Sequence, residues 1–245
     1  LKQAKVPFYK GATELHVLGK EQATGLGFVS GGTLRMVDSP LVFLHQGVVP
    51  NTQFSWSLRA KHQWDEAQLC WSPVTDAWGE LDVPGIFVAG DSGGIGGARV
   101  AALQGELAGL AAVTQNGKLT AAIRDNLAAP LRAEMREHLF IRPFLDALYR
   151  PKKANRIPAD DTVVCRCEEV TAGDIRGYVG LGCSGPNQAK SFGRCGMGPC
   201  QGRQCGLTVT ELIADKRGVS PEEIGYFRIR PPIKPITLGE LAREA

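Results

Sequence analysis

The stretch TVVCRCEEVTAGDIRGYVGLGCSGPNQAKSFGRCGMGPCQGRQCG, residues 162–206, holds six of the seven cysteines in this chain. Four of them form a C-x-C pair and, after 32 intervening residues, a C-x4-C pair: Cys165 with Cys167, and Cys200 with Cys205. Side chains two residues apart in an extended segment point to the same side, so the first pair can bind one metal centre. The second pair converges only where the backbone is irregular, which Gly202 permits. The spacing therefore predicts a four-thiolate site.

Pro199 is a residue at which a helix could begin, so thiolates beside it would meet the donors of a helix N-terminus. Four thiolates suit zinc or an iron–sulfur cluster. Zinc ribbons usually carry C-x2-C at both ends, and neither pair has that spacing. Cys195 and Cys200 also have the C-x4-C spacing of redox disulfides in some flavoprotein reductases. The residues alone leave a cluster, a zinc site and a disulfide open.

The pattern C-x-C-x32-C-x4-C resembles the bacterioferritin-associated-ferredoxin-like (BFD-like) [2Fe–2S] domain. More closely, the run CRCEEVT…GCSGPNQAKSFGRCGMGPCQGRQCG is similar to the C-terminal domain of the opine oxidase A subunits, which belong with amino-acid dehydrogenases and hydrogen cyanide synthases. The resemblance implies a small, mainly α, cluster-binding domain over residues 161–217 and a C-terminal arm over residues 218–245. It implies these cluster ligands: Cys165, Cys167, Cys200 and Cys205. In that register Cys195 lies beside the cluster as a non-ligand.

A second informative stretch, GIFVAGDSGGIGGARVA, spans residues 85–101. Gly85 to Ala89 reads as a short buried strand, followed by glycines and then by a helix with apolar residues at helical spacing. This order points backbone N–H groups and a helix dipole at an anion. The stretch resembles the second flavin motif of the glutathione-reductase-like fold. In that motif the Asp holds a ribityl hydroxyl and the helix start approaches the flavin pyrophosphate.

By that resemblance Asp91 takes the hydroxyl role, and the FAD contacts lie in the turn and helix start: Gly90, Asp91, Gly94, Ile95, Gly96, Gly97 and Ala98. The alternative is a strand–helix turn whose glycines serve packing alone. The family's first flavin motif, a G-x-G-x-x-G after an opening strand, is not found in this sequence. Residues 1–115 therefore look like the C-terminal portion of a two-domain FAD/NAD(P)-binding module. Because the chain starts with Leu1, we expect the other half to precede Leu1 or to come from another polypeptide.

Other segments predict the rest of the fold. Residues 15–37 carry β-type residues broken by Gly-containing turns, which is typical of a strand meander. The apolar run Leu41 to Leu44 predicts a buried parallel strand, and Thr52 is placed to cap a short helix. Residues 116–160 read as a helical connector and linker, interrupted at Arg142-Pro143. The predicted class is α/β: the C-terminal part of a glutathione-reductase-like module followed by a small, mainly α domain.

Within the cysteine-rich stretch, Thr171 and Asp174 bracket a helix start, and glycines follow its end. Further helices are expected over residues 186–192 and about 201–215. Cys70 and Cys183 read as buried, apolar residues. Cations near cluster ligands would raise its reduction potential, and four are close in sequence: Arg166, Lys190, Arg194 and Arg203. The alternative for these four is a solvated basic face.

Bulk composition narrows the class of protein. A 43% hydrophobic and 22% charged chain is ordinary for a globular protein. No apolar run reaches the roughly 18 residues of a membrane span, and a net charge of +3 does not argue for nucleic acid. Clustered cysteines with metal-site spacing favour a reducing compartment. The expected location is cytoplasmic, with membrane association through a complex left open.

The resemblance implies an electron-transfer subunit, carrying FAD and [2Fe–2S], of a dye-linked, oxygen-independent opine or amino-acid dehydrogenase acting on C–N bonds. The expected partners are a substrate-oxidising FAD subunit (the B subunit), the polypeptide with the missing FAD half, and an acceptor such as a quinone or dye. No catalytic residue is expected on this chain. The rival functions are a zinc-binding assembly module and a flavin disulfide reductase using Cys195 and Cys200.

Overall fold

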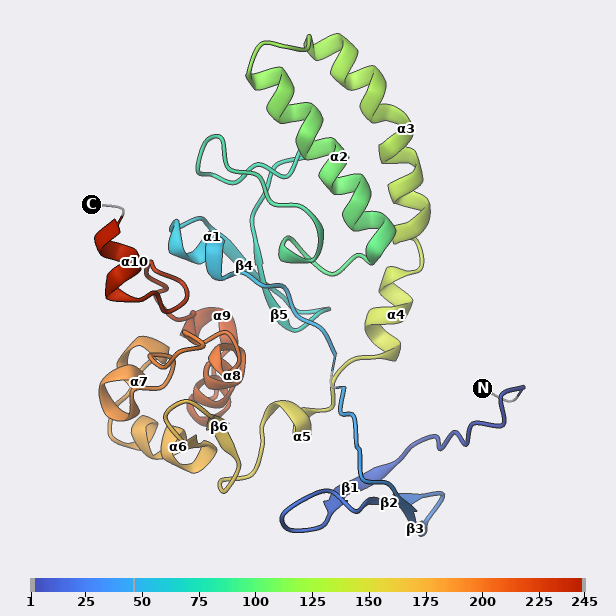
Figure 1. The fold of residues 1–245 in the computed structure, drawn as a ribbon, viewed down its shortest axis with the longest axis vertical. Helices are drawn as coiled ribbons and strands as arrows, with labels where there is room; N and C mark the ends of the chain where they lie inside the picture. Colours follow the sequence, from blue (N-terminus) through green and yellow to red (C-terminus); the bar gives the residue numbers. More distant parts are fainter. Residues whose placement is uncertain (1–2, 46, 244–245) are drawn as a thin grey trace. The chain divides into compact units, whose positions relative to one another are not determined.

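The computed structural model describes residues 3–45 and 47–243, and the chain forms two compact units, Leu1–Gln46 and Gly47–Ala245 (Figure 1). The domain boundaries expected after residues 115, 160 and 217 all lie inside the second unit and remain predictions. Within the two described ranges, none of the helices combines the length and the apolar character that crossing a membrane would need.

The first unit is built on an antiparallel sheet in the order β1-β2-β3, which confirms the predicted meander. Its strands are β1 (Thr13–Leu18), β2 (Gly25–Ser30) and β3 (Thr33–Asp38). Gly31 and Gly32, both with positive φ, form the tight turn between β2 and β3. Phe28 is 4% exposed, and its ring centre lies 5.0 Å from that of Tyr9. Nearly every side chain of β1 and β3 is exposed, so this unit buries little apolar surface of its own.

The apolar run Leu41 to Leu44 is not the buried strand that the sequence predicted. It forms no strand, and Leu41, Phe43 and Leu44 are all exposed. A buried parallel strand needs neighbouring strands for its hydrogen bonds and cover on both faces. In the part of the chain that the structure describes, no strand pairs with this run.

The second unit opens with a helix and a hairpin that carry an aromatic cluster. These elements are α1 (Gln53–Ser57), which starts directly after Thr52 as predicted, β4 (His62–Asp65) and β5 (Cys70–Pro73). Trp56 stacks on His62 with ring centres 3.7 Å apart, and it also contacts the rings of Trp71 and Tyr226. Cys70 is 2% exposed, which confirms its predicted place in a core. The ring of Tyr226 ties this cluster to the C-terminal region.

The strand predicted over Gly85 to Ala89 is wrong. This segment is a loop that folds back on residues 79–81, with an isolated bridge between Glu80 and Phe87 and a hydrogen bond from Val88 N–H to the Gly79 carbonyl. Its residues are half-buried or exposed. The physical reason is the same as for the run at Leu41: no parallel neighbour lies beside it among the described residues.

The helices expected after this loop are present. They are η1 (Gly90–Ser92), a short 3₁₀ turn, followed by α2 (Ala98–Gln115), α3 (Ala121–Leu139), α4 (Arg142–Leu148) and α5 (Lys153–Arg156). α2 and α3 pack against each other, as the green and yellow-green helices of Figure 1 show. Pro143 lies in the first turn of α4, so the predicted interruption at Arg142-Pro143 is confirmed.

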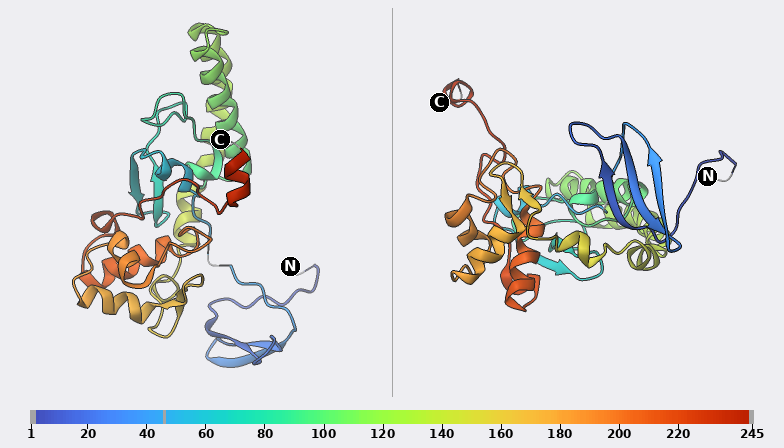
Figure 2. Two further views of the ribbon diagram at one scale, coloured as in Figure 1. Left: turned by 60° about the vertical axis from the view of Figure 1, so that its left-hand side comes forward. Right: turned by 90° about the horizontal axis from the view of Figure 1, so that it is seen from below.

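The cysteine-rich region is a small, mainly helical core. Its elements are β6 (Val163–Cys165), β7 (Val170–Thr171), α6 (Ala172–Gly180), α7 (Pro186–Gly193), α8 (Gly206–Arg217) and α9 (Pro221–Ile224), followed by α10 (Leu238–Arg243). Thr171 and Asp174 form the predicted capping box of α6. Ile175, Leu212 and Ile213 are 0% exposed at the centre of this core. Figure 2 shows α6, α7 and α8 gathered in the orange region from two directions.

The third predicted helix of this region starts later than expected. α8 begins at Gly206 rather than near Gln201, and Pro199 lies in a turn instead of at a helix start. The reason lies in the loop between Gly196 and Gly202, which closes around a buried aromatic ring described below and cannot be helical with positive φ at both glycines.

Candidate metal centre and glycine-rich turn

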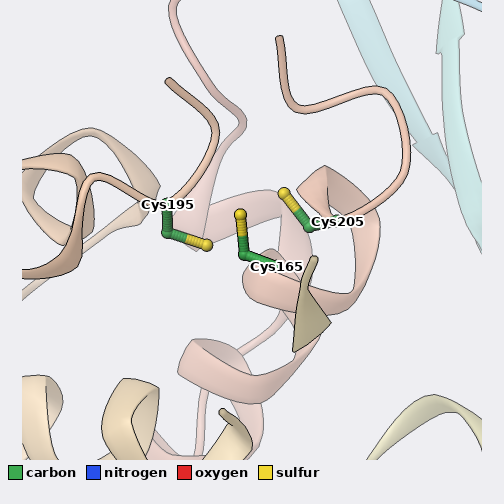
Figure 3. A group of neighbouring side chains, drawn as sticks. All are labelled: Cys165, Cys195 and Cys205. Carbon is green, nitrogen blue, oxygen red and sulfur yellow. The ribbon is translucent and has the colours of Figure 1, made fainter. Parts of the chain in front are cut away.

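Three sulfurs lie together in the cysteine-rich core. The Sγ atoms of Cys165, Cys195 and Cys205 are all within 4.8 Å of one another, and all three side chains are buried (Figure 3). Cys165 ends β6, Cys205 immediately precedes α8, and Cys195 follows α7. The sulfur of Cys205 is hydrogen-bonded to both of the others. Three segments far apart in the chain thus contribute one thiol each.

Cys167 and Cys200 form a second sulfur pair. Their thiols are hydrogen-bonded to each other, and the backbone N–H of Cys200 also donates to the Cys167 sulfur. Cys167 is exposed and Cys200 is half-buried. The four predicted ligands therefore lie as two pairs, each with one thiol from residues 165–167 and one from residues 200–205. Cys195, predicted to be a non-ligand neighbour, lies against the first pair.

The surroundings of Cys200 favour a thiolate. Burial acts to raise its pKa, but hydrogen bonds from the backbone N–H groups of Gln204 and Gly202, the bond to Cys167 and the charge of Arg203 hold the pKa below the usual value. At Cys205 the balance is opposite, because the hydrogen bond with Cys195 and burial raise the pKa of its thiol. A metal that binds Cys205 must therefore displace a proton that the metal-free protein holds firmly.

Phe227 shapes the ligand loop from inside. It is 1% exposed, and a Cβ added at Gly196 or Gly202 would lie 2.6 or 2.9 Å from its ring. Both glycines have positive φ, so the loop needs glycine there for conformation and for space. The sequence pattern gave no role to Phe227, which lies outside the cysteine motif. The only signal for it is the apolar–polar alternation that places Phe227 and Ile229 on one side of an extended segment.

A third glycine allows the two loops to meet. A Cβ at Gly198 would lie 2.2 Å from the Cβ of Cys167, so the loop passes directly over the C-x-C segment. This close approach brings Cys200 to Cys167 and explains how residues so far apart in sequence form one pair.

The four cations expected near the ligands differ in what they contact. Arg203 is the one whose charge lowers the pKa of a predicted ligand, Cys200. Arg194 donates to Glu168 at 3.0 Å, and Lys190 donates to the Arg228 carbonyl and lies over the ring of Phe227. Arg166 is exposed.

The donor set fits two metal ions better than one. In a tetrahedral zinc site with bonds of about 2.3 Å, every pair of sulfurs is separated by about 3.8 Å. The group of thiols within 4.8 Å of one another includes neither Cys167 nor Cys200. Hence the four predicted ligands do not form one tight tetrahedron in the described part of the chain. A [2Fe–2S] cluster takes four cysteines at two irons, and two sulfur pairs match that demand.

The glycine-rich turn is held by side chains of this chain. The N–H of Gly90 donates to Gln104 at 2.8 Å. Gln68 accepts from the Ile95 N–H at 3.1 Å and donates to the Ile95 carbonyl at 2.9 Å. Two predicted FAD contacts therefore have N–H groups that already serve the fold, and Asp91 is exposed.

The start of α2 is open on its solvent side. Gly97 has φ of 100° and precedes the helix without a side-chain cap, and both Gly97 and Ala98 are exposed. Gly96 is needed for packing, because a Cβ there would lie 2.6 Å from Val100, and Gly94 has φ of 144°. The assignment of these positions to FAD remains a prediction, as does the packing alternative at the other glycines.

A cavity of about 240 Å³ lies beside the ligand loop. Its walls come from the segment before and within α1, from β5, and from the cysteine-rich region, where Arg203 and Leu207 flank the Cys205 position and Tyr226 closes one side. Burial and the nearby Cys205 and Cys200 thiols raise the pKa of Tyr226, so this phenol stays protonated. The cavity thus shares a wall with the thiol cluster.

Comparison with known proteins gives these features a family. The Sarcosine oxidase A3 domain family matches residues 160–244, which include every thiol of the cluster. The opine oxidase A-chain subunit from Rhizobium meliloti is 42% identical over 95% of this chain and 44% of its own length. The chain is a homologue of the opine oxidase A subunits. The resemblance drawn from the cysteine run is thereby confirmed.

Other relatives of this opine oxidase homologue agree. The opine oxidase A-chain subunit from Agrobacterium tumefaciens (strain Ach5) is 42% identical over 95% of the chain, and the Pseudomonas protegens hydrogen cyanide synthase subunit HcnB is 33% identical over 78%. The chain covers 46% and 40% of these two proteins, so it spans about half the length of the curated relatives it matches.

A solved structure supports the fold of the opine oxidase homologue. The L-proline dehydrogenase from P. horikoshii matches 96% of this chain and 45% of its own chain, with a TM-score of 0.73 and 20% identity. The predicted fold class, part of a flavoprotein oxidoreductase module followed by a small C-terminal domain, is confirmed.

Proposed function

We propose that this chain is the electron-transfer part of a multisubunit, dye-linked opine or amino-acid dehydrogenase. Cys165, Cys167, Cys200 and Cys205 would hold a [2Fe–2S] cluster, and the turn with Asp91 would contact FAD. The observation that carries the proposal is two thiol pairs, each drawn from both loops, in a homologue of the opine oxidase A subunits. When bound, a flavin supplies two-electron chemistry and a cluster passes electrons singly.

The chain's own residues prepare the site for a negatively charged centre. The N–H groups of Gln204 and Gly202 and the charge of Arg203 stabilise a thiolate at Cys200. Cys165 and Cys205, at 1% and 2% exposure, keep water away from the other pair. Four thiolates around two ferric ions leave net negative charge, which backbone donors and cations offset. The glycine loop around Phe227 fixes these donors before metal arrives.

The proposed partners follow from the relatives and from the flavin motif that this sequence does not contain. Opine oxidase and hydrogen cyanide synthase relatives are named as subunits, which supports a hetero-oligomer. We assign C–N bond oxidation to a substrate-oxidising FAD subunit, the adenosine diphosphate end of FAD to the other half of this module, and electron removal to a quinone or dye. The cavity beside Arg203, between the aromatic cluster and the ligand loop, is where a second redox group would approach the cluster.

Metal, sulfide and flavin analysis of the purified assembly tests the proposal. We expect iron and acid-labile sulfide in a ratio of about one to one, and a visible absorption that dithionite bleaches. Cys200→Ser should abolish the cluster colour and electron flow to an external dye. Cys183→Ser is the matched control, because the buried Cys183 thiol donates to the Gly185 carbonyl instead. A colourless protein with one equivalent of zinc would contradict the proposal.

A zinc-binding assembly module is the second candidate, since Cys165, Cys195 and Cys205 alone could hold a single ion. It predicts that zinc is lost in Cys195→Ser and kept in Cys167→Ser, whereas the cluster proposal predicts the reverse for iron. The disulfide reductase needs Cys195 beside Cys200. Their sulfurs instead bond to Cys205 and Cys167, and no observation favours that function.

A further inference from the structure

Cys195 is the one thiol of the cluster that the four-ligand assignment leaves without a task. Its side chain is 0% exposed, and its sulfur lies within 4.8 Å of the sulfurs of both Cys165 and Cys205. In Figure 3 the Cys195 side chain points toward those two thiols. A hydrogen bond joins it to Cys205. By contrast, Cys183 in the same core donates to a backbone carbonyl and has no sulfur neighbour of this kind in the described thiol group.

The backbone holds Cys195 in this position. Arg194 ends α7 in the left-handed conformation with φ of 57°, and Gly196 follows with φ of 85°. The N–H of Met197 closes the turn on the Arg194 carbonyl at 2.8 Å, and Gly196 packs against the ring of Phe227. Cys195 therefore lies in a tight turn between a helix end and the wall of the core. Its contact with Cys205 is built into the fold.

We propose that Cys195 is a positioning residue that donates an S–H···S hydrogen bond to the ligand Cys205 and thereby raises the reduction potential of the cluster. This inference rests on the proposed function. In the metal-free protein, two thiols share the hydrogen bond. Metal binding removes the proton of Cys205, so the remaining S–H belongs to Cys195 and Cys205 becomes the acceptor.

The direction of the effect follows from charge. Reduction adds negative charge to a cluster and to its ligand sulfurs, so a hydrogen bond to a ligand sulfur is stronger in the reduced state. Hydrogen bonds to the sulfurs are one of the factors that set cluster potentials. Because the site is buried, water cannot replace the donor when it is removed. The loss of the Cys195 donor should therefore favour the oxidised state.

The test is a redox titration of the cluster in the purified assembly, for wild type, Cys195→Ala and Cys195→Ser. We expect Cys195→Ala to keep its iron and to show about a tenfold smaller equilibrium constant for reduction, a fall of about 59 mV for one electron. Cys195→Ser retains an O–H donor and should recover most of that fall. Cys183→Ala, which removes a buried thiol elsewhere in the core, should leave the potential unchanged.

A measurement on the wild-type protein protects the test against a variant that does not fold. Exchange into D₂O should shift the Fe–S(Cys) stretching bands in the resonance Raman spectrum, because the donated proton exchanges. Absence of an isotope shift, an unchanged potential in Cys195→Ala, or loss of iron in both Cys195 variants would each overturn the inference. Iron-free wild-type protein would instead remove the proposed function itself.

Discussion

The cysteine-rich region and the glycine-rich turn were both expected to bind a redox group, and the structure builds them very differently. The first has a closed core of its own, from Cys165 on β6 to Ile229 beyond α9, in which side chains are 8% exposed or less. The turn before α2 lies in a loop whose predicted contacts, Gly90 apart, are half-buried or exposed. One site is assembled within this chain, while the other forms a single wall.

The difference shows what each kind of site requires. Thiolate ligands need only two loops brought together, and glycines at 196, 198 and 202 allow that approach locally. A dinucleotide site in a doubly wound sheet needs strands side by side, with helix starts facing a crevice. The segments Leu41 to Leu44 and Gly85 to Ala89 lack strand neighbours in the described chain, so their strand character is not realised.

Removal of the ring under the ligand loop should have the largest effect on stability. Phe227→Ala empties the space against which Gly196 and Gly202 pack, and burial at 1% exposure predicts a loss of about 3–5 kcal/mol in the free energy of unfolding. Denaturant unfolding measures it, and iron retention should fall in parallel. The control is Phe192→Ala, since Phe192 is 45% exposed and should cost much less. Equal losses in the two variants would mean that the core does not centre on Phe227.

The ion pair between α5 and α8 should rank second. Arg156 donates to Glu211, whose side chain is 3% exposed, and burial acts to raise the pKa of that carboxyl against the opposing effect of Arg156. Arg156→Ala leaves a buried carboxylate without its partner, and we expect a loss of about 2 kcal/mol, reduced because Arg156 is partly exposed. The double variant Arg156→Ala with Glu211→Gln should recover part of the loss in thermal unfolding. No recovery would show that the pair acts through packing alone.

The capping box of α6 should contribute about 1 kcal/mol, which Thr171→Ala removes and Thr171→Ser largely keeps. Hydrogen bonds from the Thr171 backbone N–H and hydroxyl lower the pKa of Asp174 below its ordinary 3.8. Since the folded value is the lower one, this contribution is complete above about pH 4 and is lost as the pH falls through the folded pKa. Acid unfolding of wild type should be steeper in this range than that of Asp174→Asn, and identical curves would exclude the linkage.

The smallest effect on stability is expected in the glycine-rich turn. Asp91 is exposed, so Asp91→Ala should change the free energy of unfolding by less than about 0.5 kcal/mol. In the purified assembly the same variant should lower the flavin content relative to Glu106→Ala, at an exposed position on α2. Unchanged flavin in Asp91→Ala would favour the packing role of this turn and would sharpen the contrast with the cysteine-rich region.

Much of the fold was predictable because local signals agreed with tertiary contacts. The meander of β1 to β3, the helix after Thr52, the break at Arg142-Pro143 and the capping box at Thr171 each depend on residues close in sequence. The failures share another cause. The two expected parallel strands depend on neighbours, and the late start of α8 depends on Phe227, so none could be settled by local preference.

Residue order alone was enough to predict that cysteines from two distant segments form one thiol site, because spacing and glycine freedom are local properties of the chain. How the thiols divide became clear only from the packed fold: Cys167 with Cys200, and Cys165 with Cys205 and Cys195. That division depends on a ring from beyond α9 and on a loop that passes over the C-x-C segment. Contacts between residues so far apart are set by the packing of the whole core, which no spacing rule contains.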